Sequence, residues 1–229
     1  MRNTVSKANK SQRSTQASEM LDRIESGRII AIVRGDYSAH IGRIADVLVE
    51  AGINALEITM NSPAAFDVIE QVATYCAGRL LVGAGTVMDV REVSDAANAG
   101  ARFVVSPNRN ARVIRRTKQL GLLSFPGALT CSEIAEAFDA GADAVKIFPA
   151  QMAPPHVVRA LRAPLGDVRL IPTGGIASNN VEAYVNAGAW ALGIGSELVN
   201  PTVRTELGIK DLLARAREFV AAARTRSPE

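Results

Sequence analysis

Two kinds of segment alternate along this chain. Short β-branched runs predict buried parallel strands, and longer stretches with apolar residues three or four positions apart predict amphipathic helices. The expected strands are IIAIV (29–33), ALEIT (55–59), LLVGA (80–84), RFVVS (102–106), LLSF (122–125), AVKIF (144–148), RLIPT (169–173) and WALGI (190–194). The expected helices between them are 39–51, 63–77, 89–99, 110–120, 131–140, 153–163 and 178–187.

A phrase that ends helices recurs along the chain. Five expected helices close on Ala-Gly or Leu-Gly, and a β-branched run follows within a few residues. Glycine suits the left-handed position at a helix end, so each phrase marks a junction from helix to strand. These glycines are Gly52, Gly100, Gly121, Gly141 and Gly188.

Together with the strands between these junctions, the pattern gives eight β–α units. It contains no Gly-x-Gly-x-x-Gly after a strand and no second domain, which favours an α/β fold with a single (β/α)8 TIM barrel over a doubly wound open sheet. Residues 15–27 predict an extra N-terminal helix that plugs the amino-terminal end of the barrel. Residues 209–224 predict a helix on the outer wall.

The composition of the chain modifies the predicted fold mainly at the N-terminus. The 229 residues are 48% apolar and 21% charged, with a net charge of +3, as in a globular protein. Residues 1–17 hold four basic side chains and no acid, and they predict a disordered tail before a barrel over 18–229. The remainder is nearly neutral, which argues against a nucleic-acid partner. The apolar runs are too short to span a bilayer, so no membrane partner is expected.

Cysteine and histidine usage argues against a metal centre. Cys76 and Cys131 form neither a C-x-x-C motif nor a Cys/His ligand spacing, and His40 and His156 each lack a nearby partner in the sequence. We therefore expect no metal or organic cofactor and a reducing, cytoplasmic setting.

Lys146 is the sharpest candidate for chemistry. TIM-barrel active sites lie at the carboxyl ends of the strands, and this lysine sits inside the apolar run AVKIF. Alternation along a strand puts Val145 and Ile147 toward the helices, so Lys146 points into the barrel. Burial favours the neutral amine, which can attack a carbonyl carbon. The alternative is a lysine held in a structural salt bridge.

Glu57 is the expected companion of Lys146. Within ALEIT the same alternation turns Leu56 and Ile58 outward and Glu57 inward. A carboxylate at this place can accept and return protons while carbinolamine, imine and enamine interconvert. The simpler alternative is a counter-ion for the lysine.

Glycine turns follow the last two expected strands. IPTGGI (171–176) and GIGSEL (193–198) leave backbone N–H groups free to approach an anion, as in the usual phosphate site of a barrel. The sequence therefore predicts a phosphorylated ligand, with plain tight turns as the alternative.

The order of these motifs resembles the family of 2-keto-3-deoxy-6-phosphogluconate (KDPG) and 4-hydroxy-2-oxoglutarate aldolases, which includes 2-keto-3-deoxy-6-phosphogalactonate aldolases. The resemblance covers roughly residues 20–200. The matching segments are IIAIVRG (29–35), AGINALEIT (51–59), VGAGTV (82–87), VVSPN (104–108), FPGALTCSEI (125–134), AVKIFPA (144–150), PTGGI (172–176) and GIGSELV (193–199).

The resemblance implies a class I aldolase, a carbon–carbon lyase that cleaves KDPG to pyruvate and glyceraldehyde 3-phosphate. It also implies a homotrimer. Lys146 would be the Schiff-base lysine, Glu57 the general acid/base and Thr86 a ligand of the pyruvyl carboxylate. The remaining implied residues line the site (Pro107, Phe148) or hold the phosphate (Gly174, Gly175, Gly195, Ser196).

The chain departs from the family pattern after Glu57. Some members carry Leu-Arg-Thr there, whereas this sequence has Met60-Asn61-Ser62-Pro63. We expect Arg34, which ends the first strand, to supply the charge for the substrate carboxylate. The Asn-Ser-Pro segment also resembles the phosphogalactonate branch, so the C4 stereochemistry of the substrate stays open.

Two other kinds of function remain alternatives. A barrel isomerase would use Lys146 only as an electrostatic or proton-transfer group, and it would exchange substrate protons without ever becoming covalently attached to a keto acid. A non-catalytic phosphate-ligand binder would tolerate Lys146→Arg with its affinity nearly intact.

Overall fold

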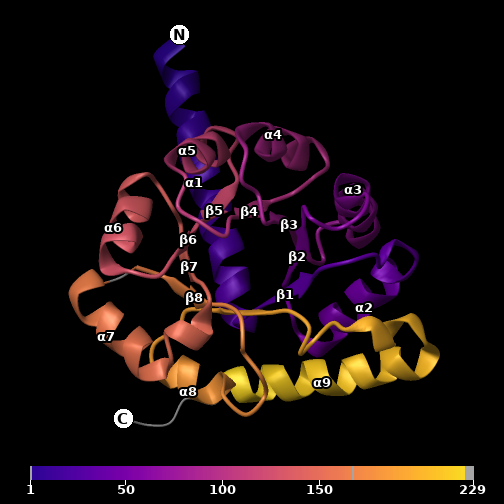
Figure 1. Ribbon diagram of the computed structural model, residues 1–229. Coiled ribbons are helices and arrows are strands. Elements are labelled where there is room, and N and C mark those ends of the chain that lie inside the picture. The colour runs from indigo at the N-terminus through magenta and orange to yellow at the C-terminus, as the bar shows by residue number, and fades with distance from the viewer. Residues whose placement is uncertain (1, 167, 225–229) are drawn as a thin grey trace.

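The computed structural model describes residues 2–166 and 168–224, with side chains described from Thr15 onward. Figure 1 shows strands curling around a common centre, with helices packed outside them. Every strand pairing is parallel. The chain therefore has an α/β fold built on a curled parallel sheet.

The strands form two hydrogen-bonded groups, ordered β5-β4-β3-β2-β1-β9 and β6-β7-β8. One isolated parallel bridge, between Thr173 and Gly193, connects the end of β8 to β9. The strands are β1 (Ile29–Val33), β2 (Ala55–Thr59), β3 (Leu81–Gly85), β4 (Phe103–Val105), β5 (Leu123–Phe125), β6 (Gly127–Ala128), β7 (Val145–Ile147), β8 (Leu170–Pro172) and β9 (Leu192–Ile194).

The eight strand positions expected from sequence are confirmed, several with shorter paired cores. The short strand β6 is additional. It follows β5 after Pro126, and proline has no N–H group to give to a ladder. The Pro126 carbonyl still accepts from the Lys146 N–H at 2.8 Å, so β7 is held beside this break.

The helices expected from the apolar spacing are also confirmed, with ends shifted by a few residues. They are α2 (Ile41–Ala51), α3 (Ala65–Cys76), α4 (Val90–Asn98), α5 (Ala111–Gln119), α6 (Cys131–Asp139), α7 (Pro155–Leu165), α8 (Val181–Asn186) and α9 (Glu206–Arg224), with short 3-10 helices η1 (Ser38–His40), η2 (Ala150–Met152) and η3 (Pro201–Arg204). Within the described ranges, no helix is long and apolar enough to cross a membrane.

Helix α1 (Arg2–Gly27) is longer than the helix expected over 15–27. Its backbone is helical from Arg2, over residues whose composition predicts disorder. The side chains before Thr15 lie outside the described set, so the predicted division into a tail over 1–17 and a barrel over 18–229 stays a prediction.

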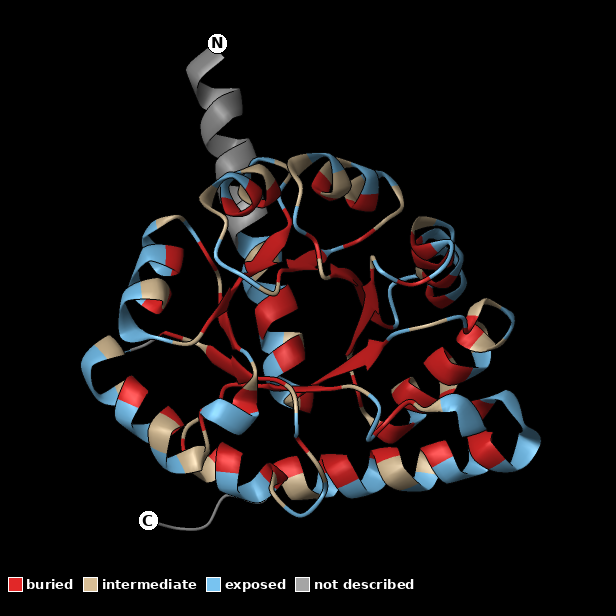
Figure 2. Cartoon of the chain, viewed as in Figure 1, coloured by how far each residue is buried: buried red, intermediate tan, exposed pale blue. Residues whose placement is uncertain are grey.

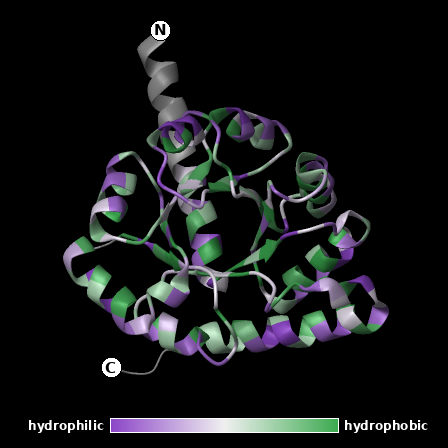
Figure 3. Cartoon of the chain, in the orientation of Figure 1, coloured by the Kyte–Doolittle hydropathy of each residue, from purple (hydrophilic) through white to green (hydrophobic). Residues whose placement is uncertain are grey.

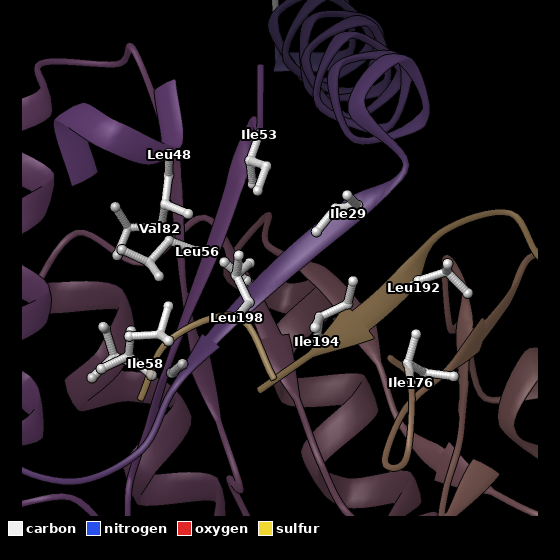
Figure 4. Close-up of a cluster of buried hydrophobic side chains, with 14 of the residues drawn as sticks. Ile29, Leu48, Ile53, Leu56, Ile58, Val82, Ile176, Leu192, Ile194 and Leu198 are labelled. Atoms are coloured by element: carbon white, nitrogen blue, oxygen red, sulfur yellow. The ribbon is translucent and has the colours of Figure 1, made fainter. Parts of the chain in front are cut away.

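Buried side chains form two clusters on the two faces of the sheet. The larger cluster lies between strands and helices and includes Leu56 and Ile58 of β2 (Figure 4). Figures 2 and 3 show the same division, with buried, apolar faces of the helices turned toward the strands. Burial of this apolar surface, at about 25 cal/mol per Å2, is the main favourable term for folding.

The smaller cluster fills the space inside the curl and forms its floor. Met20, Leu21 and Ile24 of α1 pack there with side chains from the strands. The rings of Phe103 and Phe125 lie 5.5 Å apart, and Trp190 meets Phe125 edge-on at 6.2 Å. The amino-terminal end of the sheet is therefore packed with apolar side chains.

Candidate active site

Lys146 and Glu57 meet inside the curl, as the strand alternation predicts. The Lys146 Nζ lies 3.9 Å from the Glu57 Oε1, and these side chains are only 7% and 2% exposed. Ala144 lies on the same strand face as Lys146, and Ala55 lies on the same strand face as Glu57. Both alanines belong to the smaller, inner cluster, whereas Val145 belongs to the larger, outer cluster. The distance between the Lys146 Nζ and the Glu57 Oε1 is too long for a hydrogen bond, and Glu57 Oε1 has no hydrogen-bond partner among the described residues.

The glycines of β3 make room for two side chains inside the curl, Glu57 and Phe103. In the parallel register Glu57 pairs with Gly83, and Thr59 pairs with Gly85. A Cβ atom placed on Gly85 would collide with the Glu57 carboxylate, and one on Gly83 would collide with the Phe103 ring. Only glycine therefore lets this carboxylate occupy its position.

The aromatic ring of Phe148 lies close to the lysine amine. The Lys146 Nζ lies 5.1 Å from the centroid of this ring, within cation–π range. Phe148 is 40% exposed, although its strand neighbours are buried. Lys146 also lines a small cavity of about 10 Å3, together with Ile30, Glu57, Val105, Phe125, Ile171, Thr173 and Gly193.

The loops after β1 and β2 are tied together by Ser62. Its Oγ accepts from the Gly35 N–H at 2.9 Å and lies 3.0 Å from the Thr59 Oγ1. This contact fixes the turn that carries Arg34. The Arg34 side chain is exposed and forms no ion pair with Glu57 or another described residue, so it is available to a ligand anion.

Thr86 and Pro107 lie at neighbouring strand ends. Thr86 directly follows β3, is half-buried and has a positive φ of 61°. The next residue, Val87, donates from its N–H to the Val105 carbonyl at 3.1 Å, which joins this turn to β4. The Pro107 carbonyl packs against Gly127, where a Cβ atom would collide with it.

The two predicted phosphate turns lie side by side because β8 and β9 are joined at Thr173 and Gly193. Gly174 and Gly175 have positive φ values of 91° and 75°. In the second turn the Leu198 N–H donates to the Gly195 carbonyl at 2.9 Å.

That hydrogen bond begins a helical turn in which, among the described residues, the Ser196 N–H has no acceptor. A donor of this kind at the start of a helical turn suits an anion.

Sequence reasoning did not single out four residues that shape this site. Thr173 lines the same small cavity as Lys146, Ser62 links the first two loops, and Gly85 admits Glu57. Gln151 contacts both glycines of the turn after β8. Such roles depend on contacts between distant segments, and only the TGGI turn itself carried a local signal.

The comparisons with known proteins agree with this arrangement. The family model for KDPG and KHG aldolase matches residues 20–210. A 2-dehydro-3-deoxy-6-phosphogalactonate aldolase of Escherichia coli (strain K12) is 34% identical over 86% of this chain and 94% of its own length. A 2-dehydro-3-deoxy-phosphogluconate aldolase of Treponema pallidum (strain Nichols) is 35% identical over 72% and 79%.

A solved structure is similar as well. The crystal structure of a KDPG aldolase from Legionella pneumophila, with pyruvate captured at low pH as a covalent carbinolamine intermediate, has a TM-score of 0.74 and 26% identity. The match covers 89% of this chain and 96% of that one. With a family model matched over most of its length and relatives above 30% identity, this chain belongs to the KDPG and KHG aldolase family and is a carbon–carbon lyase.

Proposed function

We propose that this protein is a class I aldolase that cleaves KDPG to pyruvate and glyceraldehyde 3-phosphate through an imine on Lys146. The observation that carries the proposal is a lysine amine, 7% exposed, 3.9 Å from a buried carboxylate at the carboxyl ends of the strands. A lysine so placed is desolvated and oriented, which are the conditions for nucleophilic attack on a carbonyl.

The first half of the reaction uses Lys146. Its neutral amine attacks the C2 ketone to give a carbinolamine, and water leaves to give a protonated imine. The imine then accepts the electron pair released when the C3–C4 bond breaks. An enamine of pyruvate remains on the lysine, and the C4 carbon leaves as an aldehyde.

Glu57 handles the protons of these steps. It takes the proton of the C4 hydroxyl, directly or through one water, as the C3–C4 bond breaks. It then returns a proton to C3 of the enamine, and water hydrolyses the resulting imine to pyruvate and free amine. A carboxylate with an unsatisfied Oε1 beside the amine is suited to this exchange.

The surrounding residues hold the two ends of the substrate. Arg34 and Thr86, at the ends of β1 and β3, bind the carboxylate of the keto acid, and Arg34 does so with a free guanidinium. Pro107 and Phe148 line the mouth. The phosphate lies at the paired turns, where Gly174, Gly175, Gly195 and Ser196 present backbone N–H groups.

A second candidate substrate is the C4 epimer, 2-keto-3-deoxy-6-phosphogalactonate. The relative of this name in E. coli is 34% identical and the probable one in Rhizobium meliloti (strain 1021) is 37% identical, against 35% for the phosphogluconate relative of Treponema pallidum. The ratio of kcat/KM for the two epimers, measured in one coupled assay of pyruvate release, assigns the substrate. A ratio above about ten for either epimer decides between them.

The imine is tested by incubating the protein with pyruvate and borohydride. Reduction fixes the imine as a stable secondary amine, which intact-mass and peptide mass spectrometry locate on Lys146. A folded protein that gains no pyruvate mass would contradict the class I mechanism and favour the isomerase or the phosphate binder.

We further propose that the curled sheet closes into a complete (β/α)8 barrel, with α1 as an additional helix plugging its floor. Two contacts support closure: the bridge between Thr173 and Gly193, and the hydrogen bond from the Lys146 N–H to Pro126.

The family resemblance supports a homotrimer, which light scattering would measure. Unpaired Cys76 and Cys131 fit a reducing, cytoplasmic setting.

The absence of a side chain at Gly85 is expected to be necessary for activity. We expect Gly85→Ala to lower kcat at least about tenfold, because the new methyl group forces Glu57 out of its position. Gly78→Ala is the matched control, since a Cβ atom there meets nothing within 4 Å, although its φ of 84° costs some stability. A Gly85→Ala enzyme that keeps its kcat while folding normally would contradict this role of Glu57.

A further inference from the structure

The segment after β7 is fixed against the end of β8. In η2 the Ala150 N–H donates to the Thr173 carbonyl at 2.8 Å. The Tyr184 hydroxyl of α8 donates to the Ala150 carbonyl at 3.0 Å. Burial raises the pKa of Tyr184, so this hydroxyl stays a donor around neutral pH. The backbone of Gln151 is therefore held beside the glycine turn that follows β8.

The side chain of Gln151 lies across that turn. Its amide fits in the orientation in which the nitrogen donates to the Gly174 carbonyl at 3.0 Å and the oxygen accepts from the Gly175 N–H at 3.2 Å. A Cβ atom placed on Gly175 would be 2.7 Å from Gln151 Cγ and Cδ. The amide therefore occupies the surface at which the proposed function places the substrate phosphate.

Nothing else in the described chain holds this side chain. Gln151 is exposed, and its amide has no hydrogen-bond partner there besides Gly174 and Gly175. Both hydrogen bonds join neutral groups, whereas a phosphate oxygen forms a shorter and stronger charge-assisted bond to the same N–H group. A phosphate can therefore replace the amide.

We propose that Gln151 is a specificity-determining residue that occupies the phosphate turn until the phosphate of the substrate displaces it. The proposal rests on the proposed function and deepens it. An unphosphorylated keto acid leaves Gln151 in place and gains nothing from the turn. Only a phosphorylated substrate frees the Gly175 N–H, so the exchange sets how strongly the enzyme favours phosphorylated over unphosphorylated keto acids.

Two substitutions at this position are expected to act in opposite directions. Gln151→Ala removes the occupant, so inorganic phosphate, which competes with the phosphate group of KDPG for the turn, should inhibit KDPG cleavage with an inhibition constant about threefold lower. Gln151→Glu places a like charge beside the phosphate. It should lower the ratio of kcat/KM for KDPG to that for 2-keto-3-deoxygluconate about tenfold.

The matched control is Gln119→Glu, which adds the same charge on α5 at an exposed position outside the site. It should keep the wild-type ratio and the wild-type inhibition by phosphate. Weaker inhibition of Gln151→Ala would make Gln151 a phosphate ligand, and unchanged inhibition would make it a bystander; either result overturns the proposal. Pyruvate trapping on Lys146 keeps the two proposals apart, since its absence in the wild type contradicts the proposed function instead.

Discussion

Lys146→Arg is expected to abolish the reduced pyruvate adduct and to lower the rate of KDPG cleavage by at least about a thousandfold. Arginine keeps a positive charge beside the buried Glu57, so the carboxylate still has a cationic neighbour. A guanidinium stays protonated in proteins and cannot form an imine. The loss therefore reports on the nucleophile and not on a missing charge.

The measurement is intact-mass spectrometry after incubation with pyruvate and borohydride, together with a coupled assay of pyruvate release. Lys210→Arg is the matched control, because Lys210 is an exposed lysine of α9. It should form the adduct like the wild type. An adduct on the Lys146→Arg protein would mean that another amine reacts, and the assignment of the nucleophile would be wrong.

Glu57→Gln is expected to lower kcat by about a hundred- to ten-thousandfold while the protein still forms an imine with pyruvate. Glutamine has the shape of glutamate but cannot accept and return a proton at the reacting carbon. The imine still forms because its nitrogen comes from Lys146, which the substitution leaves unchanged. In the wild type the Lys146 Nζ lies 3.9 Å from the Glu57 Oε1 and is not hydrogen-bonded to it.

Exchange of the pyruvate methyl hydrogens in heavy water measures this role directly, because exchange requires deprotonation and reprotonation of the C3 carbon on the enzyme. Exchange should fall in proportion to kcat in Glu57→Gln and stay unchanged in Glu70→Gln, an exposed control on α3. Normal exchange in Glu57→Gln would leave Glu57 as a counter-ion of the lysine.

The sequence predicted the positions of strands and helices because the apolar spacing is regular and the helix ends are marked by glycine. The alternation within two strands was enough to predict that Lys146 and Glu57 both point into the barrel, since a strand has only two faces. Val145 and Leu56, the strand neighbours of these two residues, belong to the larger cluster between strands and helices, as this alternation predicts. Local patterns were therefore enough to bring together the two side chains to which we assign the chemistry.

The parts that sequence missed depend on contacts between distant segments. Gly85 looks like a turn glycine, and only the register of β2 against β3 reveals that its missing side chain makes space for Glu57. Gln151 lies in a short 3-10 helix with no periodic signal. The early start of α1 has no apolar pattern behind it, because residues 2–14 are mostly polar.

The packed floor of the sheet, taken together with the proposed mechanism, gives the order in which the two products leave. Met20 and Ile24 of α1, together with the rings of Phe103, Phe125 and Trp190, close the amino-terminal end of the curled sheet. Substrates and products therefore enter and leave at the carboxyl end of the strands. In the proposed mechanism pyruvate stays bound to Lys146 after cleavage, and the triose phosphate lies between it and the open end. The aldehyde therefore leaves first, and in the reverse direction pyruvate must bind before the aldehyde that it attacks.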